Sequence, residues 1–331
     1  MIIDTHAHAI FPQAINAYVA DLVASRANPT SGPRQPITDE MLEMPMKKHI
    51  ESMDAVGTDW QIISPRPFML MHSIEPAKVT EVWTAFNNDQ IARQVKMFPK
   101  RIKGMAGLPQ HRHNDLTNVI EELERSVKEL GMVGCLINPD PTEGTMTPPP
   151  GLGNEFWYPL YEKMVELDVP GLIHSASNAH PRESYTLKFI NEESIAIVDL
   201  AESRVFEDFP TLKIIVPHGG GAIPYQIGRF RSWGIRRKMA VPFEEKIKKL
   251  YYDTALYSED ALNLLFKVVG TDNVVFGTER PGTGSAPNPD WGGRPFDDIK
   301  PVIDGLPNLT AEDRKKIFET NAIKLYGDIF K

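Results

Sequence analysis

The chain has 331 residues, 41% of them hydrophobic, which is enough for a large core and a usual length for an α/β barrel with insertions. Its 36 basic and 44 acidic residues give a formal net charge of -8 with no long basic run. This balance argues against nucleic acid or an anionic membrane as the main partner. No signal peptide and no bilayer-spanning apolar run is visible, so we expect a soluble cytoplasmic protein. The single cysteine, Cys135, excludes an intramolecular disulfide and is expected to be buried.

Short apolar runs alternate with stretches of helical periodicity along the chain, which predicts an α/β fold. Strands are expected at Ile2–Asp4, Trp60–Ser64, Ile102–Leu108, Val133–Asn138, Gly171–His174, Leu212–His218, Leu250–Asp253 and Val274–Gly277. Helices are expected at Leu116–Leu130, Trp157–Leu167, Ser194–Glu202, Phe243–Lys249 and Asp260–Val269. Eight such alternations predict a single domain, residues 1–331, with a (β/α)8 TIM-barrel fold. Residues 11 to about 46 are too many for a simple loop and are expected to form an insertion after the first strand.

Histidines and one glutamate occupy the ends of the predicted strands. His6 and His8 are two residues apart in an extended strand, so their imidazoles point the same way. His174 ends the fifth strand, His218 the sixth, and Glu279 follows the eighth. Because strand ends of a barrel converge, one divalent metal shared by His6, His8, His174 and Glu279 would satisfy all four buried polar groups. Zinc suits this set best, although manganese or iron is permitted. His218 is expected to move a proton beside the metal, with a role as a fourth histidine ligand as the alternative.

Basic side chains near the same strand ends would bind an acidic substrate. Arg66 follows the second strand, Arg229 lies in the glycine-rich segment after the sixth, and Arg280 follows the eighth. Each guanidinium could hold a carboxylate. A surface or ion-pairing role is an equal alternative for Arg229 and Arg280, and a weaker one for Arg66. Tyr185 could line the pocket or begin a helix, and Asp253 could orient a ligand or form a local cap.

With these residues in place, the chain resembles the amidohydrolase superfamily. Within it, the likeness is to the branch that contains aminocarboxymuconate-semialdehyde decarboxylase, γ-resorcylate decarboxylase and 4-oxalomesaconate hydratase. The resemblance is strongest to the zinc-dependent hydrolases of meta-cleavage products in lignin-derived biphenyl catabolism. It is carried by Met1–His8, Gly57–Phe68, Ala106–Gln110, Asn138–Pro141, Phe156–Leu167, Phe189–Glu193, His218–Phe230 and Phe276–Ser285. It implies a distorted barrel with one catalytic metal ion, a homodimer or higher homo-oligomer, and the same roles for the histidines and Glu279.

One departure from the decarboxylases of this branch shapes the predicted reaction. They carry aspartate within Gly-Ser-Asp on the eighth strand, whereas this chain has Gly277-Thr278-Glu279, which resembles the hydratase and the carbon–carbon hydrolase. We therefore predict hydrolytic cleavage of a carbon–carbon bond in an unsaturated oxo-carboxylic acid formed by aromatic ring fission, with His218 and Glu279 as catalytic residues. The alternatives are non-oxidative decarboxylation of an aromatic or muconate-type acid and, third, hydration of an oxalomesaconate-like acid. The substrate in each case is a small carboxylated molecule derived from an aromatic compound.

Overall fold

A computed structural model describes residues 1–28, 36–112 and 115–331. It contains eight short parallel strands, one in each region where a strand was expected. Their bounds are β1 Ile3–His8, β2 Trp60–Ser64, β3 Ile102–Gly104, β4 Cys135–Ile137, β5 Gly171–Ile173, β6 Ile214–Val216, β7 Tyr251–Asp253 and β8 Val274–Val275. Strand β1 runs four residues beyond its expected end at Asp4, because it stays paired with β2 as far as His8 and Ser64. His6 and His8 therefore lie within a fully buried strand.

The strands are arranged in chain order in two parallel sheets, β1-β2-β3 and β4-β5-β6-β7-β8. Single bridges lie at both breaks between the sheets. Ala106 pairs with Cys135 on one side, and Ala7 pairs with Arg280 on the other. The predicted α/β class is thus confirmed, and the expected continuous barrel is represented by two sheets joined through isolated bridges.

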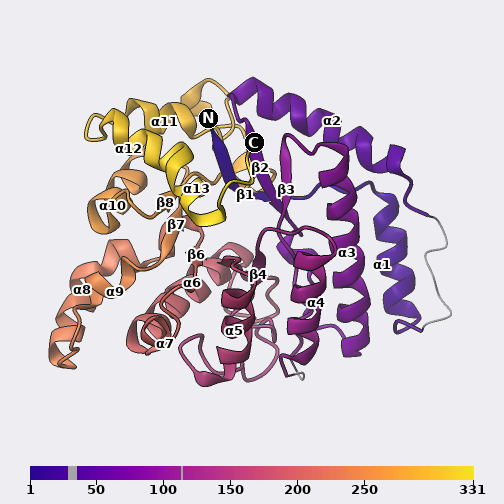
Figure 1. The fold of residues 1–331 in the computed structure, drawn as a ribbon, viewed down its shortest axis with the longest axis horizontal. Helices are drawn as coiled ribbons and strands as arrows, with labels where there is room; N and C mark the ends of the chain where they lie inside the picture. Colours follow the sequence, from indigo (N-terminus) through magenta and orange to yellow (C-terminus); the bar gives the residue numbers. More distant parts are fainter. Residues whose placement is uncertain (29–35, 113–114) are drawn as a thin grey trace.

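Helices surround the strands (Figure 1). Their bounds are α1 Ala14–Ala24, α2 Asp39–Val56, α3 Ala77–Met97, α4 Thr117–Lys128, α5 Tyr158–Glu166, α6 Tyr185–Glu202, α7 Val205–Asp208, α8 Ile223–Arg236, α9 Phe243–Ile247, α10 Glu259–Val269, α11 Lys300–Gly305, α12 Ala311–Lys315 and α13 Asn321–Tyr326. Helix α6 begins nine residues before the expected Ser194, because the Ser184 side chain accepts a hydrogen bond from the backbone N–H of Leu187. Among the described residues, no helix is both long and apolar enough to cross a membrane.

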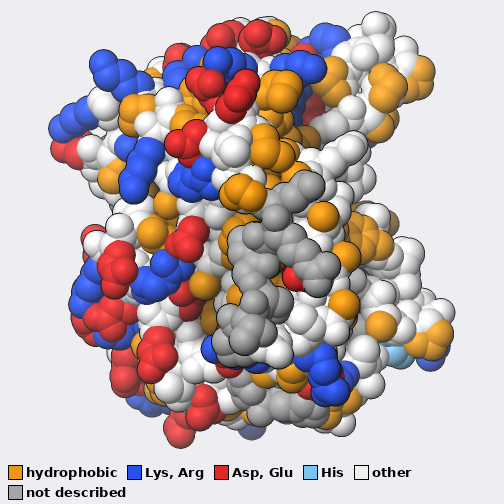
Figure 2. All heavy atoms as spheres, turned by 90° about the vertical axis from the view of Figure 1, so that its right-hand side faces the viewer, with side chains coloured by type: hydrophobic (Ala, Val, Ile, Leu, Met, Phe, Trp, Pro, Cys, Tyr) orange, Lys and Arg blue, Asp and Glu red, His pale blue; other side chains and the backbone are white. Residues whose placement is uncertain are grey.

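The expected insertion at residues 11–46 holds α1 and the first part of α2, and its residues 29–35 lie outside the described part of the chain. Helix α1 packs on α3 through aromatic contacts. The ring of Tyr18 lies 4.5 Å from that of Phe86 and 6.0 Å from that of Trp83, measured between centroids. Figure 2 shows the face that carries this layer, on which acidic, basic and apolar side chains are interspersed.

The main core lies between the strands and the surrounding helices. Cys135 is fully buried in it, as expected, beside apolar strand residues such as Ile137 and Ile173. Large side chains complete the packing, with Trp157 1% exposed. This apolar support holds the strand backbones that carry the polar residues described next.

Candidate metal centre

Four histidines meet at the carboxyl ends of the strands. The ring centroids of His6, His8 and His174 lie 5.2 to 5.3 Å from one another, and that of His218 lies 5.5 Å from His6. Two overlapping sets have ligand atoms within 4.8 Å of one another: His6 with His174 and His218, and His8 with His174 and Glu279. The structure thus brings together all five residues expected to form the centre.

Hydrogen bonds to Nδ1 determine which nitrogen of the first three rings faces the centre. Nδ1 of His6 donates to the carboxylate of Asp253 at 2.6 Å, and Nδ1 of His174 donates to the carbonyl of Ser175 at 2.9 Å. Nδ1 of His8 lies 3.1 Å from the hydroxyl of Ser64. That hydroxyl gives its one proton to the carbonyl of Ala7, so it can only accept from His8. In the neutral tautomer, each Nε2 is left with a free lone pair directed away from its support.

The three Nε2 atoms fit a divalent cation. All three are buried and lack a hydrogen-bond partner within the described part of the chain, which is costly unless something binds them. Burial and the neighbouring histidines lower the pKa of His8 to about 3 and that of His174 well below its ordinary value, so both rings are neutral and able to coordinate. The donor set of three imidazoles and a carboxylate is one that divalent transition metals accept.

Glu279 completes this set in a constrained position. Its backbone has a φ of 60°, and its N–H donates to the carbonyl of His6 at 2.7 Å, which directs the side chain toward the histidines. The hydroxyl of Tyr257 donates to Oε2 at 2.6 Å, while Oε1 lies 3.4 Å from Nε2 of His218. Burial raises the pKa of Glu279, but the charge of His218 and the hydrogen bond to it outweigh burial and hold this pKa well below its usual range.

His218 lies between two carboxylates. Its Nδ1 contacts Oε1 of Glu193 at 2.6 Å, and its Nε2 faces Glu279. Burial lowers the pKa of His218, but the charges of Glu193 and Glu279 prevail and raise it well above its ordinary value. Burial raises the pKa of Glu193 to about 7. This geometry suits an imidazole whose Nε2 exchanges a proton with a bound molecule.

Arg66 and Tyr185 lie beside the metal centre. Burial lowers the pKa of Arg66, while Tyr185 and Glu279 oppose that effect, so the three side chains lie within electrostatic range of one another. The ring of Tyr185 packs against Phe189 at 4.7 Å, and Tyr185 is the first residue of α6. It therefore both begins the helix and borders the site. Within the described residues, no ion pair occupies the guanidinium of Arg66, although Phe68 lies beneath it at 6.0 Å.

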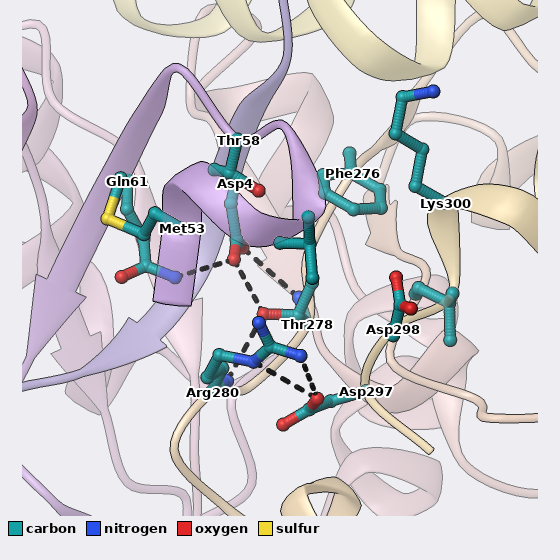
Figure 3. Close-up of a pocket in the computed structure, with 12 residues that line it drawn as sticks. Asp4, Met53, Thr58, Gln61, Phe276, Thr278, Arg280, Asp297, Asp298 and Lys300 are labelled. Carbon is teal, nitrogen blue, oxygen red and sulfur yellow. Dashed lines mark hydrogen bonds and ion pairs between the residues drawn. The ribbon is translucent and has the colours of Figure 1, made fainter. Parts of the chain in front are cut away.

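The other two candidate arginines are placed differently. Arg229 is exposed on α8. Nε of Arg280 donates to Asp297 at 3.0 Å, and its side chain lines a pocket together with Asp4, Thr278 and Asp297 (Figure 3). A substrate contact for Arg229 or Arg280 stays a prediction, and these two environments weaken it.

Several supporting residues were not identified from the sequence. Asp253 was expected either to orient a ligand or to form a local cap, and it does both. One oxygen accepts from Nδ1 of His6, and the other accepts from the N–H of Ala255 at 3.1 Å. Glu193 was given no role of its own, yet its carboxylate supports the ring of His218. Tyr257 carried no signal at all. Such contacts join residues far apart in the chain, so no local pattern indicates them.

Comparisons with known proteins extend over almost the whole chain. The amidohydrolase family profile (Amidohydro_2) matches residues 3–327. A 2-keto-4-carboxy-3-hexenedioate hydratase from Sphingobium sp. is 37% identical over 330 residues, covering 98% of this chain and 96% of the hydratase. The crystal structure of 4-oxalomesaconate hydratase from Rhodopseudomonas palustris matches with a TM-score of 0.88 and 34% identity, covering 98% of this chain and 95% of that one.

Decarboxylases are more distant. A gamma-resorcylate decarboxylase from Polaromonas sp. is 28% identical over 300 residues, covering 84% of this chain and 86% of the enzyme. A dihydroxybenzoic acid decarboxylase from Polaromonas sp., solved with bound manganese and 2-nitroresorcinol, shares the fold with a TM-score of 0.72 at 23% identity over 98% of this chain and 96% of that one.

The comparisons overturn the predicted carbon–carbon hydrolase. The relatives that match nearly the full length at 37% and 34% identity are hydratases, so the third of the three predicted reactions has the stronger support. The expectation went wrong because the hydratase and the carbon–carbon hydrolase were expected to share glutamate after the eighth strand, so this residue does not distinguish them. The family profile, the fold and the histidine cluster agree, and the chain belongs to the amidohydrolase family as an enzyme of its hydratase- and decarboxylase-containing branch.

Proposed function

We propose that this enzyme is a metal-dependent hydratase that adds water to the carbon–carbon double bond of an oxalomesaconate-like oxo-carboxylic acid. The observation that carries the proposal is the full-length similarity to two hydratases of such acids, combined with a preorganised histidine and glutamate centre. The reaction balances without a redox step: the hydroxyl of water bonds to one alkene carbon and a proton bonds to its neighbour.

In this proposal His6, His8, His174 and Glu279 hold one divalent cation, either zinc or manganese. When bound, the cation lowers the pKa of water and stabilises negative charge on a substrate oxygen. Manganese is bound in the dihydroxybenzoic acid decarboxylase structure that shares the fold. Zinc rests on the donor set alone.

The side chains around the centre bind the substrate and transfer protons in this proposal. Arg66 binds a substrate carboxylate through its guanidinium, which has no ion pair among the described residues, and Tyr185 borders the same space. Nε2 of His218 delivers the proton to the substrate carbon, while Glu193 holds the ring in orientation through Nδ1. Glu279, whose Oε1 lies 3.4 Å from Nε2 of His218, accepts the proton released by water.

The architecture around this site is part of the proposal. The two sheets, with bridges at both breaks, are consistent with a distorted TIM barrel formed by one domain over residues 1–331. Its substrate would be a small carboxylated compound from aromatic catabolism. A homo-oligomer remains a prediction.

The experiment uses metal-loaded protein with 4-oxalomesaconate and, separately, with 2-keto-4-carboxy-3-hexenedioate, the compounds for which the two similar hydratases are named. Loss of the conjugated absorbance together with a mass gain of one water supports hydration. Release of carbon dioxide instead would indicate a decarboxylase, and two shorter acids would indicate carbon–carbon hydrolysis. An unchanged substrate with fully metal-loaded protein would refute a hydratase of this substrate class.

A further inference from the structure

A buried carboxylate lies behind the proposed metal ligands. Asp4, on β1, is 1% exposed and lies between Gln61 and Thr278 in the view of Figure 3. Its Oδ1 accepts from the backbone N–H groups of His6 and Thr278, both at 3.1 Å. Its Oδ2 accepts from Nε2 of Gln61 at 2.8 Å and from the hydroxyl of Thr278 at 2.6 Å. Both oxygens are thereby used within the protein.

These bonds connect the two chain segments that carry proposed ligands. His6 belongs to β1, and Thr278 directly precedes Glu279, so one oxygen of Asp4 binds the backbone on both sides of the centre. The two segments have no covalent connection nearby, because 271 residues separate Thr5 from Phe276, which are themselves hydrogen-bonded. A shift of either segment would change the distance between the His6 ring and the Glu279 carboxylate.

The surroundings of Asp4 supply only donors. Oε1 of Gln61 is held by His49, so the amide NH2 of Gln61 must face Asp4. The hydroxyl oxygen of Thr278 accepts from the N–H of Arg280 at 3.2 Å, so its proton is free to point at Asp4. Arg280 is in turn held by Asp297. In Asp4→Asn, the amide NH2 would face the donors of Gln61 and Thr278 instead of accepting from them. If the amide were rotated by 180°, its NH2 would instead face the backbone N–H groups of His6 and Thr278.

We propose that Asp4 is a positioning residue of the metal centre, which sets the spacing of His6 and Glu279 by binding the backbone of both segments. The proposal rests on the metal centre of the proposed function. It assigns no contact between Asp4 and the metal or the substrate. Replacing groups that hydrogen-bond the ligand side chains themselves typically weakens metal binding about 10- to 100-fold, and we expect an effect of the same order for Asp4.

The test compares the Asp4→Asn variant with the wild-type protein. Dissociation constants for Zn²⁺ and Mn²⁺ are measured by competition with a chromophoric chelator, and folding is checked by circular dichroism and by thermal melting of the metal-free proteins. We expect metal binding about 10- to 100-fold weaker in folded Asp4→Asn protein. The matched control is Asp297→Asn, a carboxylate that is equally buried in the same network but binds only Arg280 and Ser285 among the described residues. Its metal affinity should stay close to that of the wild type.

Unchanged affinity in Asp4→Asn, or an equal loss in Asp297→Asn, would overturn the proposal. If Asp4→Asn does not fold, Thr278→Val removes one of the four bonds and should weaken metal binding, whereas Thr278→Ser keeps the hydroxyl and should not. Equal affinities in that pair would likewise overturn it. A wild-type protein that binds metal but hydrates no substrate refutes only the proposed function. A wild-type protein that binds no metal refutes both proposals.

Discussion

Asp253 provides the strictest test of how the metal centre is preorganised. One of its oxygens accepts from Nδ1 of His6 at 2.6 Å, and the other accepts from the N–H of Ala255 at 3.1 Å. The Asp253→Asn variant keeps the shape but has a single acceptor oxygen. If the amide NH2 faces His6, the ring must carry its proton on Nε2, which removes the lone pair from the centre.

The size of the effect follows from the bond that is lost. A buried hydrogen bond to a charged group contributes about 1.5 to 3 kcal/mol, which corresponds to a roughly 10- to 100-fold change in an equilibrium constant. We therefore expect the metal dissociation constant of Asp253→Asn to rise by that factor. The proposed hydratase activity should fall less at saturating metal than at limiting metal, because added metal compensates for weaker binding.

The assay is chelator competition followed by activity measurements over a range of metal concentrations. Far-UV circular dichroism and the melting temperature of the metal-free protein report any loss of the bond to Ala255. The Asp297→Asn variant again controls for loss of a buried carboxylate away from His6. Wild-type metal affinity in a folded Asp253→Asn protein would show that Asp253 does not determine the His6 tautomer.

Three further predictions concern the substrate, the core and the loop after β8. Replacing Arg66 with Met should lower kcat/KM for an oxo-dicarboxylate about 10- to 100-fold. The kcat/KM of Arg66→Lys should lie between those of the wild type and Arg66→Met. A wild-type KM in Arg66→Met would exclude Arg66 as the carboxylate contact. Burial raises the pKa of Cys135 to about 12. At about pH 8, iodoacetamide should therefore label the native protein only as fast as the structure around Cys135 unfolds. Rapid labelling would contradict this burial. The Cys135 thiol has a pKa of 9.0 in the unfolded chain, so it ionises at lower pH there than in the folded protein. The free energy of unfolding should therefore fall as pH rises from about 9 to 12. In urea titrations, Cys135→Ala should make this fall with pH less steep. In Gly282→Ala the new Cβ would lie 2.4 Å from the carbonyl oxygen of Glu279, so metal affinity should fall. The control is Gly305→Ala, whose Cβ meets nothing within 4 Å and should leave metal affinity unchanged. Equal affinities in the two variants would show that the loop adjusts without moving Glu279.

The strand ends show how far local patterns reach. Alternation along β1 places His6 and His8 on one side, and apolar runs locate β5, β6 and β8, so His174, His218 and Glu279 could be identified as neighbours before any coordinates. The arginines show the limit. Arg66, Arg229 and Arg280 all follow predicted strands, and the sequence does not tell them apart. In the fold Arg229 is exposed on α8, Arg280 is paired with Asp297, and Arg66 lies within electrostatic range of Glu279.

The sequence by itself predicted the α/β class and the five residues that lie together at the candidate metal centre. Both predictions rest on strand periodicity and on the alternation of strands and helices, which can be read from neighbouring residues in the chain. Tertiary structure alone decided how those residues are tuned. The supports of the centre come from Asp253 for His6, Ser64 for His8, Glu193 for His218 and Tyr257 for Glu279, each a contact between distant segments. The orientation of an imidazole or a carboxylate depends on what fills the space behind it, and only the packed fold specifies that neighbour.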